Sequence, residues 1–322
     1  MVVVVNLDGD GNGDLAAHSL TVRTCVKSAS GHVHVAVAVK VHVHDPDPDG
    51  VHGFRESENS MTSHNEIWFE SHGTRLHAIE MGDKNAHPVV FIHGGLADHR
   101  AALLNAAPLT AAYRVIMPDL RGAGRSVYRD ELSWQALADD LIALLDHLGI
   151  TRAAVGGSSM GSAVALRCAL SHPERVLGLL LVSAVYPGTD RGLTQAQQAA
   201  MRAIGEAGQT ALEHGMDALI PLYSRLPDPI RERATAMMKE FDAASLAATT
   251  RLLASNVQPF ESITELAKIS VPTLVVPGTD AEHPAEVAEL YAQHLPHARL
   301  AQPGPELAAA LTNFCAALPW HN

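Results

Sequence analysis

The residue best suited to chemistry in this chain is Ser159, in the sequence Gly-Ser-Ser-Met-Gly at 157–161. A short apolar run at 153–155 precedes this segment, and a helical pattern of apolar residues follows it. Glycines two residues before and after a serine allow a strand to turn sharply into a helix, with the hydroxyl held at the top of the sheet. We therefore expect Ser159 to be a nucleophile and the backbone N–H of Met160, at the helix start, to stabilise an oxyanion. Ser158 has no glycine two residues after it and is the less favoured nucleophile.

Two more motifs precede this serine, Phe-Ile-His-Gly-Gly at 91–95 and Met-Pro-Asp-Leu-Arg-Gly-Ala-Gly-Arg-Ser at 117–126. Together the three motifs resemble the α/β-hydrolase superfamily, in particular its esterase, bromoperoxidase-like and enol-lactonase-like branch. The resemblance covers about residues 61–318, and it implies that the N–H of Gly95 is the second donor of the oxyanion hole. The family usually has a histidine at the position of Ala123, a difference that we expect to affect packing of the turn rather than chemistry.

A candidate for the acid of such a site follows a later apolar run. The segment 271–280, Val-Pro-Thr-Leu-Val-Val-Pro-Gly-Thr-Asp, resembles the strand and turn that carry the family's aspartate, and Pro284 follows four residues later. Asp280 thus lies at the strand end from which it could orient an imidazole. The alternative is a turn aspartate that caps the helix predicted from Ala285 onward.

The histidine that such a site needs is absent from its usual position. Members of the family carry it in a Gly-x-x-His loop after the last strand, whereas residues 299–306 contain no histidine and lead through Pro-Gly-Pro into a helix. We favour His283 as the general base, because it follows Asp280 by three residues in a loop at the expected end of the sheet. As an alternative, His283 caps a helix or lines the pocket.

The direction of the chain divides the other histidines between the two edges of the sheet. In a parallel sheet only the carboxyl ends of strands and the amino ends of helices face such a site. His93 and His99 lie on this side; the resemblance implies a structural ring for His93, and we expect His99 at the surface. His214, in a helical segment, stays open as a candidate. Four histidines belong at the opposite end of the sheet: His172, His294, His297 and His321.

Strand and helix patterns alternate from residue 61 onward, which predicts an α/β fold with a mostly parallel sheet flanked by helices. Short apolar runs, typical of strands buried on both faces, occur at 89–92, 114–117, 153–155, 179–182 and 273–276. Residues 187–269 show helical patterns alone. Because a helical insertion between two strands cannot extend the sheet, we expect it to form a lid over the strand ends, between core segments 61–186 and 270–322.

Residues 1–60 differ in composition from the rest of the chain. Valine and histidine alternate with a period of two over much of 32–44, before Asp-Pro-Asp-Pro-Asp-Gly at 45–50. We expect a low-complexity extension that is disordered or non-native, with Met61 as the natural start. The alternative is a strand whose histidines bind a metal ion, although no carboxylate or cysteine stands among them: His32, His34, His42 and His44.

Composition narrows the classes of partner. The formal charge of −12, with no run of basic residues, argues against nucleic acid, and no stretch is apolar for long enough to span a membrane. The three cysteines, Cys25, Cys168 and Cys315, have neither disulfide nor zinc spacing, which favours the cytoplasm. A homo-oligomer is compatible with the sequence.

These expectations combine into one function, a serine hydrolase that cleaves a small ester, lactone or similar acyl compound through an acyl-enzyme on Ser159. No metal or organic cofactor is required for this chemistry. Two alternatives stay open: a non-catalytic binding protein of the same fold, suggested by the missing last-loop histidine, and a cofactor-free haloperoxidase-like enzyme, which would use the same residues.

Overall fold

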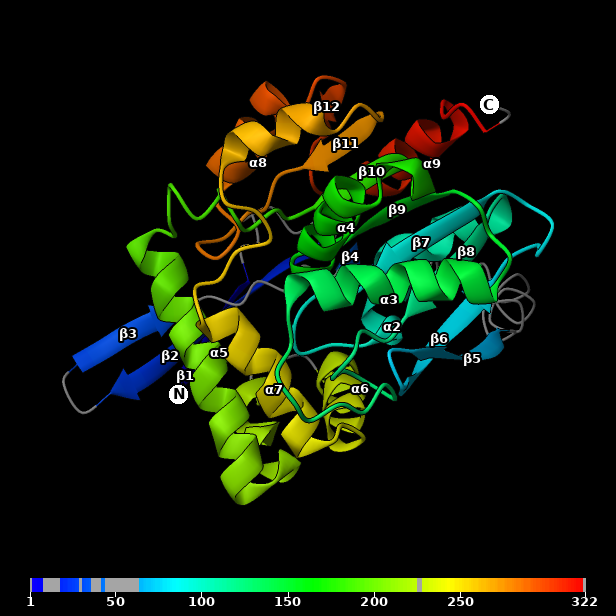
Figure 1. The fold of residues 1–322 in the computed structure, drawn as a ribbon. Coiled ribbons are helices and arrows are strands. Elements are labelled where there is room, and N and C mark those ends of the chain that lie inside the picture. The colour runs from blue at the N-terminus through cyan, green and yellow to red at the C-terminus, as the bar shows by residue number, and fades with distance from the viewer. Residues whose placement is uncertain are drawn as a thin grey trace, which may run out of the picture.

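The computed structural model describes residues 64–224 and 228–320 (for 229 and 230, the backbone alone), together with the backbone of four strands before residue 64. An eight-stranded sheet runs through the body of the protein, in the order β12-β11-β10-β9-β7-β8-β6-β5 (Figure 1). Its strands are β5 (Asn65–Ser71), β6 (Thr74–Met81), β7 (Pro88–Ile92), β8 (Arg114–Pro118), β9 (Ala153–Ser158), β10 (Val176–Val182), β11 (Thr273–Val276) and β12 (Ala298–Leu300).

The sheet is mostly parallel, as the alternating pattern predicts. Only β6 runs against the rest, since it pairs antiparallel both with β8 and with β5, its partner in the opening hairpin. The turn of this hairpin has positive φ at His72 and Gly73. The remaining strand pairs are parallel, so their carboxyl ends meet at one edge of the sheet. The predicted fold class is confirmed.

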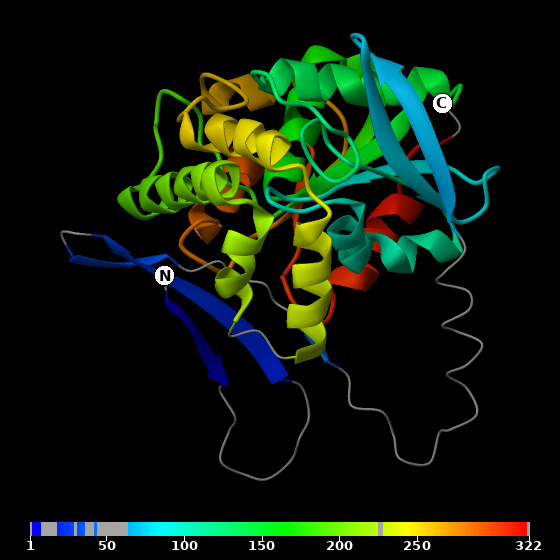
Figure 2. The ribbon, with the colours of Figure 1, turned by 90° about the horizontal axis from the view of Figure 1, so that it is seen from below.

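Alternating side chains build a hydrophobic core on each face of the sheet. In β7, Val90 and Ile92 belong to one core, whereas Val89 and Phe91 belong to the other. Helices cover both faces, as the two perpendicular views show (Figure 1, Figure 2). The first core includes residues of α3 (Trp134–His147), α4 (Met160–Ser171) and α8 (Ala285–His294); the second includes residues of α2 (His99–Ala106) and α9 (Leu307–Ala316). Short 3-10 helices follow α2 and α4, namely η1 (Ala107–Ala111) and η2 (Pro173–Arg175).

In the described part of the segment between β10 and β11, helices are joined by loops and no strand occurs. The segment contains α5 (Gln195–His214), η3 (Met216–Tyr223), α6 (Asp228–Lys239), α7 (Ala243–Ala254) and η4 (Ile263–Lys268). A third apolar cluster, which includes Leu219, Phe241 and Leu246 of this segment, also packs against Leu96 in the loop after β7. The helical segment therefore covers the carboxyl end of a central strand, where the sequence predicts a lid.

The four strands before residue 64 form a separate antiparallel sheet: β1 (Val2–Leu7), β2 (His18–Ser28), β3 (Gly31–Val35) and β4 (His42–Val43). Residues 36–41 and 44–63, which include part of the alternating valine-histidine stretch, lie outside the described residues. The expected extension and its alternative metal site stay predictions.

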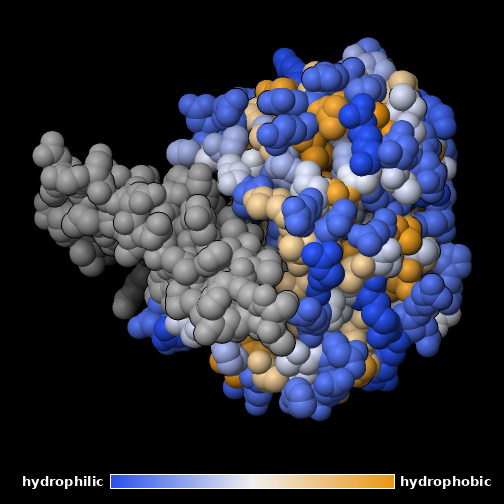
Figure 3. Space-filling model, turned by 90° about the vertical axis from the view of Figure 1, so that its left-hand side faces the viewer, coloured by the Kyte–Doolittle hydropathy of each residue, from blue (hydrophilic) through white to orange (hydrophobic). Residues whose placement is uncertain are grey.

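Polar side chains predominate on the face that Figure 3 shows, and apolar ones are scattered among them. This distribution is ordinary for a protein whose apolar residues pack into internal cores. Within the described part of the chain, no helix is both long and apolar enough to cross a membrane.

Candidate active site

Ser159 occupies the sharp turn between β9 and α4. Its backbone has φ 54° and ψ −117°, a conformation that is strained for a residue with a side chain. Gly157 and Gly161 permit the turn by close approach: a Cβ on Gly157 would lie 2.6 Å from the carbonyl oxygen of Ile92 and 2.7 Å from the carbonyl carbon of Gly161. The N–H of Ser159 donates to the carbonyl of Val182 at 2.9 Å, which ties the turn to β10.

The structure brings the three residues singled out for catalysis within hydrogen-bond distance. His283 Nε2 lies 2.8 Å from Ser159 Oγ, and His283 Nδ1 lies 2.9 Å from Asp280 Oδ1. The side chains of His283 and Asp280 are 13% and 7% exposed, so bulk water has little access to this pair. The arrangement is that of a nucleophile, a base and an orienting carboxylate.

A tight turn explains how acid and base share one loop. Asp280 Oδ1 accepts the backbone N–H groups of Glu282 at 2.9 Å and His283 at 3.0 Å, besides the ring N–H of His283. This carboxylate therefore folds the loop and also holds the imidazole. The loop doubles back so closely that a side chain at Gly278 would overlap the Cβ of His283.

Burial and charge act in opposite directions on His283. Burial alone lowers the pKa of the imidazole, but the hydrogen bond to Asp280 and the negative charge of that carboxylate outweigh it. The pKa of His283 therefore lies above its ordinary value, which suits a base that must hold a proton during reaction.

The two predicted oxyanion donors lie beside this serine. Met160 is the first residue of α4, so its N–H has no acceptor within the helix. The loop after β7 packs against the same turn, since a Cβ on Gly94 would lie 3.5 Å from Ser159 Cβ. A Cβ on Gly95 would lie 4.0 Å from Met160 Sδ and 2.8 Å from Leu253 Cδ1 of α7. The helical segment thus closes over the loop that carries Gly95.

His93 has the structural role that the resemblance implies. The ring is buried; its Nε2 accepts the N–H of Leu120 at 3.0 Å, and its Nδ1 donates to the carbonyl of Gly94 at 2.6 Å. Burial lowers its pKa, which keeps the ring neutral. Both nitrogens are engaged in holding loops, so His93 is not available as the base.

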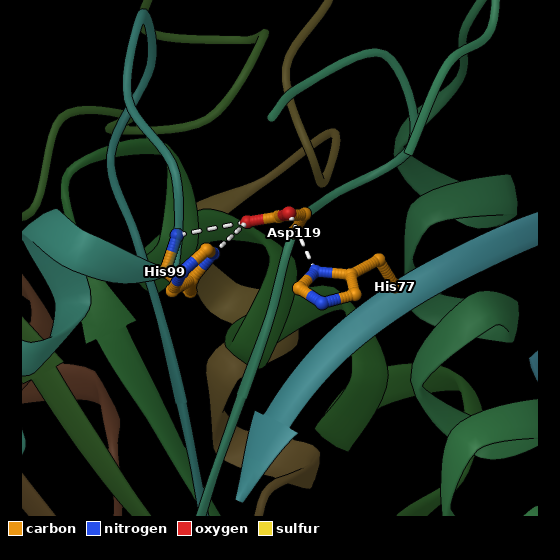
Figure 4. A group of neighbouring side chains, drawn as sticks. All are labelled: His77, His99 and Asp119. Atoms are coloured by element: carbon orange, nitrogen blue, oxygen red, sulfur yellow. Dashed lines mark hydrogen bonds and ion pairs between the residues drawn. The ribbon is translucent and has the colours of Figure 1, made fainter. Parts of the chain in front are cut away.

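The expectation of a surface position for His99 is wrong. Its side chain is only 14% exposed, and its Nδ1 lies 2.7 Å from Asp119 Oδ1 (Figure 4). Asp119 is buried and also accepts from His77 Nδ1 at 2.8 Å and from the N–H groups of His99 and Arg125, both at 2.9 Å. Although two imidazoles and a carboxylate are a common metal-binding set, these hydrogen bonds occupy both carboxylate oxygens without an ion. His77 and Asp119 lie 42 residues apart, so no local spacing in the sequence predicts that these two side chains pair.

Of the other candidate histidines, His172, His294 and His297 lie at the opposite edge of the sheet, as the chain direction predicts. His214 is 67% exposed at the end of α5. The carbonyl of His297 accepts the N–H of Thr273, at the amino end of β11; His172 directly follows α4, and His294 is the last residue of α8. His321 lies outside the described residues.

A buried carboxyl that no sequence pattern marks lies next to the acid–base pair. Glu282 is 6% exposed, and burial raises its pKa to about 7, with a further increase from Asp280 and an opposing effect of His283. No pattern in the surrounding sequence predicts this burial.

Comparison with known proteins agrees with this architecture. A probable proline iminopeptidase of Streptomyces coelicolor is 32% identical over an alignment of 197 residues, which covers 55% of this chain and 59% of that protein. The chain spans between about a third and three-fifths of the length of three curated relatives that it matches.

Two solved structures share the fold. The enol-lactonase from Burkholderia xenovorans LB400 superposes with a TM-score of 0.64 at 22% identity, over 78% of this chain and 98% of that one. A thermophilic esterase from Thermogutta terrifontis gives a TM-score of 0.61 at 24% identity, over 79% and 96%. The family model described as the alpha/beta hydrolase fold matches residues 87–305, more than half of the chain. The protein therefore belongs to the α/β-hydrolase fold family.

Proposed function

We propose that this protein is a serine hydrolase that cleaves a small ester, lactone or similar acyl compound through an acyl-enzyme. One observation carries the proposal: the continuous hydrogen-bonded path from Ser159 Oγ through the ring of His283 to Asp280. Membership of the α/β-hydrolase fold family supports a hydrolase, and structural neighbours that are an esterase and an enol-lactonase support the acyl class.

In the proposed reaction, His283 acts in turn as base and as acid. His283 Nε2 takes the proton of Ser159 as Oγ attacks the acyl carbon, and Asp280 stabilises the imidazolium through Nδ1–H. The N–H groups of Gly95 and Met160 bind the oxyanion as the tetrahedral intermediate forms. The imidazolium then protonates the leaving oxygen, and a water molecule activated by the same ring hydrolyses the acyl-enzyme.

Apolar side chains support a small, largely apolar acyl group. Leu253 of α7 lies directly against Gly95, and Leu96 joins the apolar cluster of the helical segment. A carbonyl placed at the oxyanion donors would therefore have aliphatic side chains close by. We propose that this helical segment acts as the lid that selects the acyl group.

The test compares wild-type protein with Ser159→Ala on p-nitrophenyl acetate, p-nitrophenyl butyrate and L-proline p-nitroanilide. We expect ester turnover in wild type and its loss in Ser159→Ala, with the melting temperature unchanged. Ser158→Ala is the matched control, because that hydroxyl accepts a hydrogen bond from Asn105 at 3.1 Å, whereas His283 pairs with the hydroxyl of Ser159.

Three results would change the proposal. Higher kcat/KM on the proline anilide would make the enzyme a peptidase, as the iminopeptidase relatives suggest. Turnover that survives in Ser159→Ala but not in Ser158→Ala would move the nucleophile. Failure of both turnover and labelling by a fluorophosphonate probe would leave a binding protein.

A further inference from the structure

A second carboxyl group lies beside the proposed base. One side-chain polar atom from each of Asp280, Glu282 and His283 lies within 4.8 Å of the other two. Asp280 has a clear role in the hydrogen-bonded path to Ser159. Glu282 has none: its Oε1 is buried and has no hydrogen-bond partner among the described residues. A buried carboxyl oxygen without a partner is costly, which calls for an explanation in function.

The backbone of Glu282 is held on both sides. Its N–H donates to Asp280 Oδ1 at 2.9 Å, and its carbonyl accepts from Gln197 Nε2 at 3.1 Å. Gln197 belongs to α5, is fully buried, and also donates to the carbonyl of Val185 at 2.7 Å. These contacts lock the loop after β11 to the loop after β10, so the Glu282 carboxyl stays in the interior beside His283.

The charged and titratable groups around Glu282 are few. Asp280 and His283 face it from its own loop, and Tyr186, from the loop after β10, has a pKa that the charge of Glu282 raises further beyond the effect of burial. Gln197 faces it from α5 as a neutral amide. Within the described part of the chain, the imidazole of His283 is the one cationic group that shifts the pKa of Glu282. The carboxylate of Glu282 therefore has one electrostatic counterpart, the imidazolium.

We propose that Glu282 is a positioning residue whose carboxylate, together with that of Asp280, stabilises the imidazolium of His283 while Ser159 attacks. This inference rests on the proposed function, since it needs His283 to be the base. An ionised Glu282 favours the protonated ring, because opposite charges within a few ångströms stabilise each other in a medium of low polarity. The reaction creates positive charge on that ring, so the second carboxylate favours the transition state over the resting state.

The test measures the second-order rate at which a neutral fluorophosphonate labels Ser159 from pH 4.5 to 9.5. In labelling, the Oγ–phosphorus bond forms, fluoride leaves, and the serine proton passes to His283, so the rate falls as that ring becomes protonated. Wild type is compared with Glu282→Gln and Glu282→Met, which remove the charge but keep the volume. Glu286→Gln is the matched control, because Glu286 is exposed in the first turn of α8 and loses the same charge.

We expect both Glu282 variants to lower the midpoint of the acidic limb, because the imidazolium has lost a stabilising charge. Their rate on the pH plateau should fall by about tenfold, much less than in a variant without the base. Glu286→Gln should match wild type in both respects. Thermal unfolding of each variant separates these effects from loss of the fold, and the two Glu282 replacements provide one folded variant if the other fails.

The inference is overturned if folded Glu282→Gln or Glu282→Met keeps the wild-type midpoint, or if Glu286→Gln shifts it equally. Those results leave the proposed function standing, since Ser159 would still be labelled. Absence of labelling in wild type at every pH instead refutes the proposed function itself.

Discussion

At the residue scale, the unusual feature is a base that follows its acid by three residues. Such closeness in sequence brings a conflict, since Asp280 must face back along the loop while the ring of His283 reaches across to Ser159. The structure resolves it by letting one oxygen, Oδ1 of Asp280, accept two backbone N–H groups and the ring N–H together. The same carboxylate folds the loop and orients the imidazole.

This geometry predicts a large effect of His283→Ala. Without the imidazole, the serine hydroxyl has no acceptor for its proton, so kcat/KM on an activated ester should fall by about a thousandfold or more. The measurement is p-nitrophenyl acetate turnover. His214→Ala, which removes an exposed histidine of α5, should keep wild-type turnover. Near-wild-type activity of His283→Ala would mean that another group accepts the proton.

At the element scale, Asp119 joins three elements. It follows β8 and accepts hydrogen bonds from His77 of β6 and His99 at the start of α2 (Figure 4). Burial alone would raise the pKa of Asp119, but the hydrogen bonds from His77 and His99 and the charge of His99 hold it far below its ordinary value. The pKa of His99 is correspondingly raised, because Asp119 outweighs the effect of burial.

We therefore expect Asp119→Asn to lower the free energy of unfolding by about 3 kcal/mol at pH 7, since an amide cannot accept on both sides. A depressed pKa contributes stability above the unfolded-state value, and this contribution is lost as pH falls through the folded-state pKa. The difference between wild type and variant in urea unfolding should thus shrink below about pH 4.

Asp139→Asn is the matched control for this prediction. Asp139 also accepts from a histidine, His172 at 2.8 Å, but its side chain is 30% exposed. Solvent screens that pair, so we expect a loss below about 1 kcal/mol. Equal losses in the two variants, or a loss in Asp119→Asn that persists undiminished at low pH, would contradict the role given to the buried carboxylate.

At the scale of the whole molecule, the eight-stranded sheet begins only at Asn65. All its strands and the site residues Ser159, Asp280 and His283 lie after that point. We therefore predict that a protein lacking residues 1–60 keeps its ester turnover and melts within about 5 °C of the full chain. Differential scanning calorimetry and the p-nitrophenyl acetate assay check this. A larger decrease would show that the first segment packs on the body.

Local patterns in the sequence were sufficient to predict the fold class and the turn that carries Ser159. Short apolar runs, the helical insertion and the glycines around Ser159 depend on neighbouring residues, and they predicted the sheet and the turn between β9 and α4. The same turn placed Met160 at the start of the following helix, whereas the role of Gly95 was implied by the family resemblance.

Tertiary structure alone decided which side chains touch. β10 lies between β9 and β11, so His283 must cross two strand spacings of about 4.8 Å to reach Ser159, and only the folded loop with its close contact at Gly278 shows that it does. His77 and His99 meet on Asp119 because three elements distant in the sequence converge there. Burial of Glu282 depends on α5 and on the loop after β10, packed around it from elsewhere in the chain. Such contacts depend on the arrangement of whole elements, which spacing along one segment does not encode.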